Sequence, residues 1–251
     1  MEKEFEKIIE EFKKLNMKGY MKGINNNLYN SAGLTLENQL GKNPDSMFFP
    51  DYYGVEVKCT QRFSRYNISL FSLAFDGPDL YESNYLLETY GIRDNVYHEH
   101  KKLIVNLKLN RKVLVYGKYY FELKIDYDSK KIFIRIYDDK FDFLEDRAFI
   151  YFDSLEQRLR VKLHHLALFY ASKNVSNDNF YFRYYKLECY KYKGIEAFIK
   201  CIEEEDVLVA LILRFAKSGK DFLKNKNKSL QFSIRKKNLE SLFDLIYYFE
   251  N

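Results

Sequence analysis

Proline and glycine are scarce in this chain, and that scarcity limits the folds open to it. There are 3 Pro and 10 Gly in 251 residues, so most of the backbone must lie in long regular elements. Hydrophobic residues make up 47% and charged residues 31%, which excludes a mainly disordered chain. No apolar run reaches the roughly 18 residues that a transmembrane helix needs, so we expect no membrane protein.

Charge and cysteine content limit which binding partners and which cellular compartment we expect for this protein. Lys and Arg number 41 against 36 Asp and Glu, and the resulting net charge of +5 permits nucleic-acid binding without requiring it. The 3 Cys are widely spaced, which argues against a disulfide framework or a zinc site. The first residues mix both charges and lack the apolar core of a signal peptide, so we expect a cytoplasmic protein.

Helical and strand periods alternate along the chain. Apolar residues at helical spacing predict helices over 2–15, 34–40, 155–173 and 194–204, with a last helix after Asn238. Alternating or short apolar runs predict strands at 54–60, 66–75, 180–192, 207–216 and 230–235. The stretch 103–137 predicts a meander of three or four antiparallel strands. The fold class is therefore α/β with a mixed sheet and a β-rich middle section.

One segment concentrates charged groups where a strand begins. Asp51 stands just before the predicted strand, and Glu56 and Lys58 are two residues apart on it, so they share a face. Gly54 permits a turn or bulge that carries Asp51 over that face. The non-functional interpretation is a solvated strand with an ion pair. The functional interpretation is a catalytic site with two carboxylates and an ammonium group.

This arrangement suits metal-dependent cleavage of a phosphodiester. Mg²⁺ prefers oxygen ligands, commonly one or two carboxylates with waters and a substrate phosphate. Asp51 and Glu56 supply carboxylates, and the carbonyl of Val57 is a plausible third ligand. A bound metal lowers the pKa of water and offsets charge on the phosphate, and Lys58 would contact either group.

The same segment carries a family resemblance. Gly33-Leu34-Thr35-Leu36-Glu37, Leu40-Gly41, Pro50-Asp51 and Gly54-Val55-Glu56-Val57-Lys58 stand in the order that the MvaI/BcnI family of type II restriction endonucleases shows. That family is related to the mismatch-repair nicking enzyme MutH, within the PD-(D/E)XK nucleases. The resemblance is dense over about residues 17–78 and looser beyond, where Lys162, Phe198 and the final helix resemble the second half of the family.

The resemblance implies a fold, an activity and a division of the chain. It implies a restriction-endonuclease-like, MutH-like mixed sheet flanked by helices. It implies a single unit over 1–251, with catalysis in about 1–150 and DNA recognition in about 151–251. Glu37 would orient Lys58 or a metal-bound water, and the cofactor would be Mg²⁺. The enzyme would act as a monomer on double-stranded DNA, and a restriction role would pair it with a cognate DNA methyltransferase.

Basic and polar residues outside the catalytic segment are candidates for DNA contact. Phosphate neutralisation needs Lys and Arg, and base edges are read by Arg and Gln. The candidates are Lys18, Lys22, Arg62, Arg65, Lys228, Gln231, Arg235 and Lys236. The C-terminal segment departs from the family pattern because no histidine follows His165, so the family's target sequence does not carry over.

Two alternatives to a restriction enzyme stay open. The same catalytic residues would serve a MutH-like or Sau3AI-like nicking endonuclease, which methylation sensitivity would distinguish. A non-catalytic DNA-binding module on a nuclease fold would bind DNA without cutting it. The complete catalytic set argues against that module.

Overall fold

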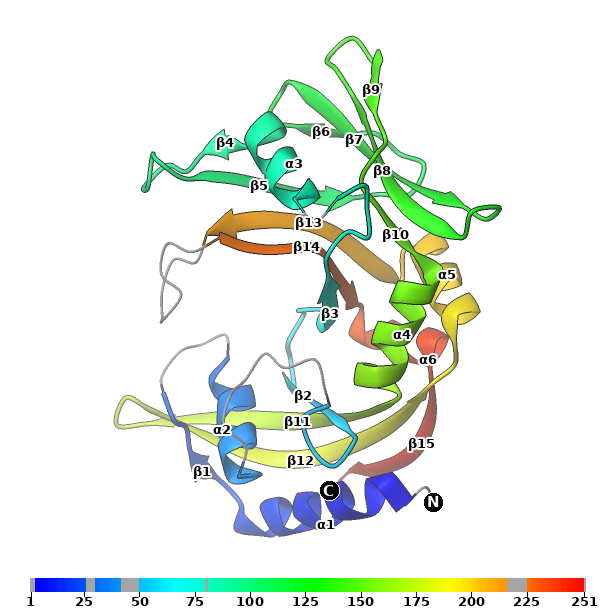
Figure 1. Cartoon of the computed structure of the whole chain (residues 1–251). Helices are drawn as coiled ribbons and strands as arrows, with labels where there is room; N and C mark the ends of the chain where they lie inside the picture. The colour runs from blue at the N-terminus through cyan, green and yellow to red at the C-terminus, as the bar shows by residue number, and fades with distance from the viewer. Residues whose placement is uncertain (1–2, 26–29, 42–49, 80, 216–224, 251) are drawn as a thin grey trace. The chain divides into compact units, whose positions relative to one another are not determined.

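The computed structural model divides the chain into two compact units (Figure 1). It describes residues 3–25, 30–41, 50–79, 81–215 and 225–250, with the backbone alone for 225–229. Unit 1 contains Met1–Ile68, Arg158–Gly194 and Leu239–Asn251, and unit 2 contains Ser69–Gln157 and Ile195–Asn238. The expected division at about residue 150 separates a catalytic part from a DNA-recognition part of the chain. It is not a division into compact units, and it stays a prediction.

Unit 1 is built on a mixed five-stranded sheet in the order β1-β12-β11-β2, with β15 also pairing with β12 (Figure 1). β11 and β2 run parallel and the remaining pairs run antiparallel, which confirms the predicted mixed sheet. In the described part of the chain β2 pairs with β11 alone, so it lies at an edge. The strands are β1 (Met21–Lys22), β2 (Glu56–Gln61), β11 (His165–Ser176), β12 (Asn179–Tyr192) and β15 (Phe243–Glu250).

Two helices, α1 (Lys3–Lys18) and α2 (Ser31–Gln39), cover one face of this sheet. The predicted apolar stripe of the first helix is confirmed, since its buried residues are Phe5, Ile8, Ile9, Phe12 and Leu15. They form one core with Val55 and Val57 at the start of the catalytic strand. Burial of each large apolar side chain contributes about 1.5–3 kcal/mol, so this core fixes which face of β2 points inward.

The predicted helix over 155–173 is wrong beyond residue 163. α4 (Phe152–Leu163) ends there and β11 begins at His165. Leu155, Leu159 and Leu163 do form the buried stripe of the helix. Residues 166–171 are buried on both sides because β11 lies between β2 and β12. An apolar run of this kind fits a helix or an interior strand, and periodicity alone does not separate them.

The predicted last helix is also wrong over most of its length. α6 (Leu239–Leu242) is a single turn, and the residues after it form β15. The aromatic side chains at Phe243, Tyr247, Tyr248 and Phe249 suit a strand. Pairing with β12 gives the backbone groups of this segment their hydrogen bonds, which a helix would otherwise supply internally.

Unit 2 contains two further sheets. One has the order β10-β8-β7-β6 with β9 pairing with β8, and the other has the order β3-β14-β13-β5-β4. The predicted meander is confirmed for β6 to β8, whereas the segment 103–109 contributes β5 to the other sheet. The strands are β3 (Ile68–Leu73), β4 (Ile92–Arg93), β5 (Lys101–Leu107), β6 (Val113–Val115), β7 (Tyr119–Asp126), β8 (Lys131–Tyr137), β9 (Phe143–Glu145), β10 (Phe149–Tyr151), β13 (Val207–Phe215) and β14 (Asn225–Ile234).

Unit 2 contains α3 (Glu82–Tyr90), α5 (Ile195–Glu203), the 3-10 turn η1 (Lys236–Asn238) and the first half of α4. The predicted helix over 194–204 is confirmed, and its Phe198 packs against Phe71 and Phe232 of the neighbouring sheet. β13 alternates buried and half-buried residues, so its predicted double-sided burial is complete on one face only. Among the residues described, no helix is both long and apolar enough to cross a membrane.

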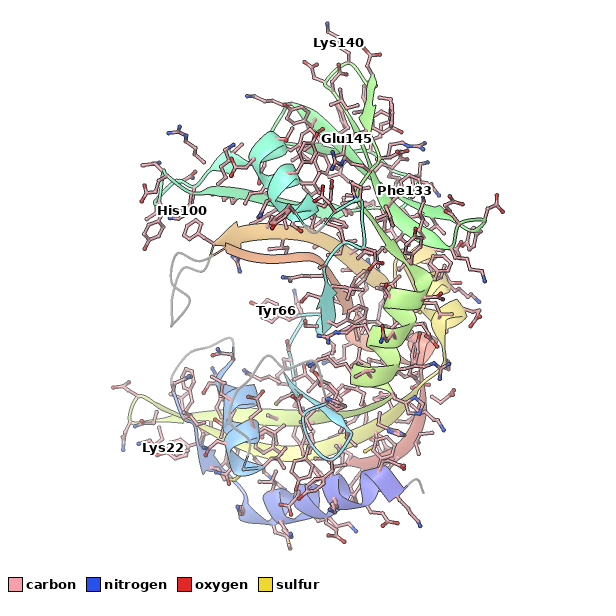
Figure 2. All side chains as sticks on the ribbon, in the orientation of Figure 1. Lys22, Tyr66, His100, Phe133, Lys140 and Glu145 are labelled. Atoms are coloured by element: carbon pink, nitrogen blue, oxygen red, sulfur yellow. The ribbon has the colours of Figure 1, made fainter. Side chains whose placement is uncertain are left out.

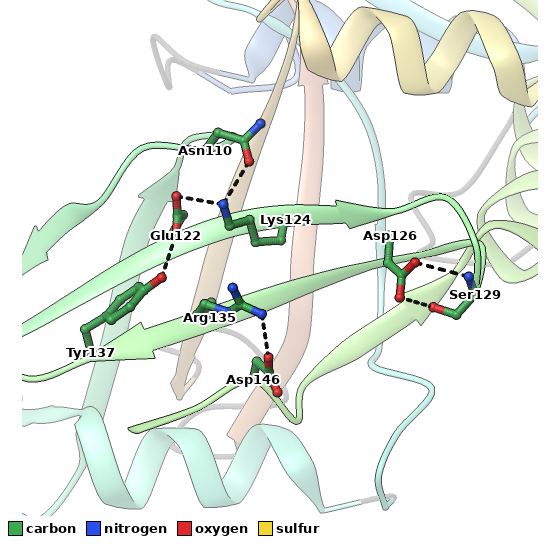
Figure 3. Close-up of polar contacts among 8 residues, drawn as sticks. All are labelled: Asn110, Glu122, Lys124, Asp126, Ser129, Arg135, Tyr137 and Asp146. Carbon is green, nitrogen blue, oxygen red and sulfur yellow. Dashed lines mark hydrogen bonds and ion pairs between the residues drawn. The ribbon is translucent and has the colours of Figure 1, made fainter. Parts of the chain in front are cut away.

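A polar network occupies the outer face of the meander (Figure 3). Glu122 is buried, and it accepts a hydrogen bond from the hydroxyl of Tyr137 at 2.9 Å and pairs with Lys124 at 3.3 Å. Arg135 pairs with Asp146 at 3.0 Å. The network is not complete, because the buried Nε of Arg135 has no hydrogen-bond partner among the described residues.

Candidate active site

A tight turn precedes the catalytic strand. Tyr52 and Val55 exchange two backbone hydrogen bonds of 2.9 Å, and the residues between them, Tyr53 and Gly54, have φ angles of 48° and 85°. Positive φ at both central residues defines a type I′ turn, for which glycine at the second position is favoured. The turn predicted at Gly54 is therefore present, and it reverses the chain directly after Asp51.

Asp51 folds back onto the strand that follows it. Its Oδ2 accepts a hydrogen bond of 3.2 Å from the backbone N–H of Val57. In an extended strand the N–H and C=O of one residue point to the same edge, so the carbonyl of Val57 points to the edge of β2 that Asp51 occupies. The Asp51 carboxylate and the Val57 carbonyl thus lie on one side of the strand.

Glu56 and Lys58 project from the face of β2 opposite the core. Val55 and Val57 are 0% and 6% exposed on the core side, and alternation places the two charged side chains on the other. The Nζ of Lys58 lies 2.5 Å from Oε1 of Glu56. Glu56 is itself only 1% exposed, so this carboxylate is held away from bulk water.

α4 adds two basic residues that the predicted catalytic set lacks. The Nζ of Lys162 lies 3.2 Å from Oε2 of Glu56, so each carboxylate oxygen faces a lysine. Burial lowers the pKa of Arg158, and the negative charge of Glu56 opposes that effect. The signal in the sequence is their i, i+4 spacing on a helix whose leucine stripe occupies another side.

Burial dominates the electrostatics of Glu56, and the neighbouring charges act in both directions. Burial raises its pKa, Lys58 lowers it, and the neighbouring charge of Asp51 raises it. Lys58 and Lys162 compensate the buried carboxylate of Glu56, one at each oxygen. The chemistry of the donor set fits a divalent cation that prefers oxygen, because Asp51, Glu56 and the Val57 carbonyl offer oxygen atoms at the start of one strand and water can complete the coordination. Among the described residues, no group of three or more His, Cys, Asp or Glu side chains is placed to hold a metal ion.

Glu37 lies on α2, which packs against β2. Its side chain is half-buried, and its charge adds to the effect of burial that raises the pKa of Cys59 to about 12. Cys59 follows Lys58 directly in the strand. The structure therefore brings Glu37 to the catalytic strand, and its role in orienting Lys58 or a water stays a prediction.

The candidate DNA-contact residues are distributed over both units. Lys18, Lys22, Arg62 and Arg65 belong to unit 1, and Gln231, Arg235 and Lys236 belong to unit 2. Lys22 and Arg62 are exposed, as Figure 2 shows for Lys22, whereas Lys18 donates a hydrogen bond of 3.2 Å to Gln39. Arg235 is exposed and Gln231 is half-buried. The backbone of Lys228 lies in β14, but its side chain is outside the described residues.

The fold and the site together define a nuclease of the restriction-endonuclease type. A mixed sheet flanked by helices carries an Asp before an edge strand and a Glu-x-Lys pair on that strand. The chain belongs to the MvaI/BcnI restriction endonuclease family, whose sequence profile matches residues 9–243. It is therefore a type II site-specific deoxyribonuclease, and the resemblance seen in the sequence is confirmed.

Solved structures agree with this fold. The chain is similar to the restriction endonuclease MvaI in complex with its cognate DNA substrate, with a TM-score of 0.87, 21% identity and 98% of each chain covered. It is also similar to MvaI in the absence of DNA, with a TM-score of 0.61, 19% identity, and 99% of this chain and 98% of that chain covered. The comparison with curated proteins found no match.

Proposed function

We propose that this enzyme cuts double-stranded DNA in a Mg²⁺-dependent reaction at the site formed by Asp51, Glu56 and Lys58. The observation that carries the proposal is the meeting of two carboxylates and two lysines at the first residues of β2. We assign the cation to Asp51, Glu56 and the carbonyl of Val57. When bound there, it would polarise the scissile phosphate and lower the pKa of a water.

Each residue of the site has a defined task. The Val57 N–H holds the Asp51 carboxylate at the edge of β2, so it needs little rearrangement to bind a cation. Lys58 is placed to hold the attacking water and to stabilise the charge that develops on the phosphate. Lys162 compensates the second oxygen of Glu56 and so opposes the rise in pKa that burial causes. Glu37 orients Lys58 or the water.

Recognition follows from the remaining candidates. We expect Gln231, Arg235 and Lys236 of unit 2, with Lys228, to contact the DNA, because Arg and Gln can read base edges in two-point contacts. We propose that the enzyme acts as a monomer in the cytoplasm. A cognate methyltransferase acting on the same sequence would protect the DNA of the host.

A plasmid assay tests this function. Supercoiled unmethylated plasmid is incubated with the protein and Mg²⁺, beside one sample with EDTA and one with Lys58→Ala. Discrete linear fragments that vanish in both controls support restriction. Accumulation of a nicked form that depends on methylation would favour the nicking alternative. Tight binding with no cleavage on methylated and unmethylated DNA alike would favour a binding module and refute the proposal.

A further inference from the structure

β12 carries a bulge beside the strand that pairs with β2. Its register with β11 joins Lys186 to Tyr170 and Tyr184 to Ala171, which leaves Tyr185 as an extra residue. A bulge redirects the side chains that follow it and is common next to active sites.

The bulge reverses which residues of β12 face the core. After it, Leu187 and Cys189 lie in the core, and before it, Phe182 and Tyr184 do. Along the chain, the core-facing residues change from even to odd numbers across Tyr185. Arg183 is consequently turned away from the core, whereas an unbroken alternation would have pointed it inward.

Arg183 therefore shares a face with the catalytic residues. Its register partner on β11 is Ser172, which lies on the face opposite Ala171 and Phe169 of the core. Glu56 and Lys58 project from that same face of the sheet. The bulge thus adds a cation to the catalytic face of unit 1.

One nitrogen of the half-buried Arg183 guanidinium, the buried Nε, has no hydrogen-bond partner within the described part of the chain. The nearby hydroxyl groups of Ser172 and Tyr20 bond to each other at 3.2 Å. A buried donor without a partner costs free energy, which a ligand with acceptor oxygens would recover.

Arg62 lies at the end of β2, close to the same bulge. Its backbone N–H donates to the carbonyl of Ala171 at 3.0 Å, and its guanidinium lies 5.8 Å from the ring centre of Tyr185. No carboxylate pairs with Arg62 or Arg183 among the residues whose side chains are described. Glu188 on the same strand is taken by Lys186 at 2.9 Å.

We propose that Arg183 and Arg62 bind backbone phosphates of the DNA strand that enters the active site. This inference rests on the proposed function. A guanidinium fits a phosphate with two parallel hydrogen bonds, and that of Arg62 lies between the rings of Phe63, at 5.5 Å, and Tyr185, at 5.8 Å. Arg62 is four positions beyond Lys58, or about 13 Å along the strand at about 3.3 Å per residue. At that distance, a phosphate contact by Arg62 would position the DNA strand without touching the scissile bond.

The salt dependence of DNA binding tests this directly. Fluorescence anisotropy of a labelled duplex is measured in EDTA, where no cleavage occurs, over a series of salt concentrations. Each lost phosphate contact should reduce the slope of log Kd against log salt by about 0.9. We expect that reduction for Arg183→Gln and again for Arg62→Gln, and about twice that for the double variant.

Matched variants make the result decisive. Lys173→Gln removes the same charge from the opposite face of β11, where Lys173 lies over the ring of Phe180 at 4.4 Å, and should leave the slope unchanged. Arg183→Lys keeps the charge but not the two-point contact, so it should keep the slope and weaken binding several-fold. If Arg183→Gln fails to fold, an unchanged affinity of Arg183→Lys overturns the inference.

Failure of this inference can be separated from failure of the proposed function. If the wild-type enzyme cuts plasmid and both arginine-to-glutamine variants keep the wild-type salt slope, the phosphate contacts alone are refuted. A wild-type protein that neither binds duplex nor cuts it would refute the nuclease assignment as well.

Discussion

The backbone N–H of Val57 donates a hydrogen bond of 3.2 Å to the carboxylate of Asp51. This bond joins the residue before the turn to the strand after it, so the position of Asp51 depends on the strand rather than on a free loop. The buried side chain of Val57 holds that strand against the core. Stability of the core and placement of the carboxylate are therefore coupled.

Lys58→Ala should abolish cleavage while sparing DNA binding. The ammonium group is expected to act on the charge that develops during reaction, and loss of one such group typically costs about 100- to 1,000-fold in rate. The measurement is the rate of plasmid cleavage under Mg²⁺, with binding followed separately in EDTA. Lys14→Ala, at an exposed residue paired with Glu11 on α1, is the control that should keep full activity.

Asp51→Asn should separate metal binding from folding. The asparagine oxygen can still accept the Val57 N–H, so the thermal unfolding midpoint should stay close to that of the wild type. The negative charge is lost, and we expect cleavage to fall about 100-fold or more at a fixed Mg²⁺ concentration. A Mg²⁺ titration of cleavage checks this, and a wild-type response to Mg²⁺ would exclude Asp51 as a ligand.

Lys162→Met should destabilise the protein, and a divalent cation should restore part of the loss. The substitution leaves a 1%-exposed carboxylate with one fewer cation, at an expected cost of about 1–3 kcal/mol. A cation bound by Glu56 would replace the missing charge. Thermal unfolding with and without Mg²⁺ measures both effects, and a Mg²⁺-induced shift no larger than that of the wild type would contradict the assignment.

Gly54→Ala should destabilise the turn before β2. Gly54 has a φ of 85°, a region that costs an L-residue about 1–2 kcal/mol. Gly33→Ala provides the contrast, because Gly33 lies in α2 with open space around it and no positive φ. That change should be neutral or stabilise by up to about 1 kcal/mol. Urea unfolding of both variants distinguishes backbone strain from a general intolerance of alanine.

The stability of Glu82→Gln relative to the wild type should increase as the pH rises. Glu82 is buried and pairs with Arg147 at 3.0 Å, and burial raises its pKa above the ordinary value despite that arginine. A raised pKa means that the folded state binds the proton more tightly, so wild-type stability falls as the pH rises through the folded-state pKa. Glutamine has no such dependence. Urea unfolding between about pH 4 and 8 should show the wild-type advantage shrinking with pH, and a growing advantage would contradict the assignment.

The catalytic strand was predictable because its information is local. Alternation of Val55, Glu56, Val57 and Lys58 specifies two faces, and only one of them can enter a core. Glycine after Tyr53 favours a type I′ turn that brings Asp51 back to the strand. The alternation and the turn depend only on residues a few positions apart, and both are present in the folded protein.

The errors arose where the partner was distant in sequence. The runs at 165–173 and 243–250 are apolar enough for either a helix or a strand. They are strands because β12 offers each of them a hydrogen-bonding edge. Lys162 belongs to the family pattern in the sequence. Its contact with Glu56 was not predictable, because it depends on the packing of α4 beside β2.

The sequence by itself determined the class of site: the acid before the strand, the Glu-x-Lys pair on it, and the order of motifs that places the chain in its family. Tertiary structure alone decided which other residues reach that site. Lys162 meets Glu56 through helix packing, and Arg183 faces the catalytic side through one extra residue in β12. The reason is physical, because strand pairing is non-local and a shift of one residue exchanges the two faces of a strand.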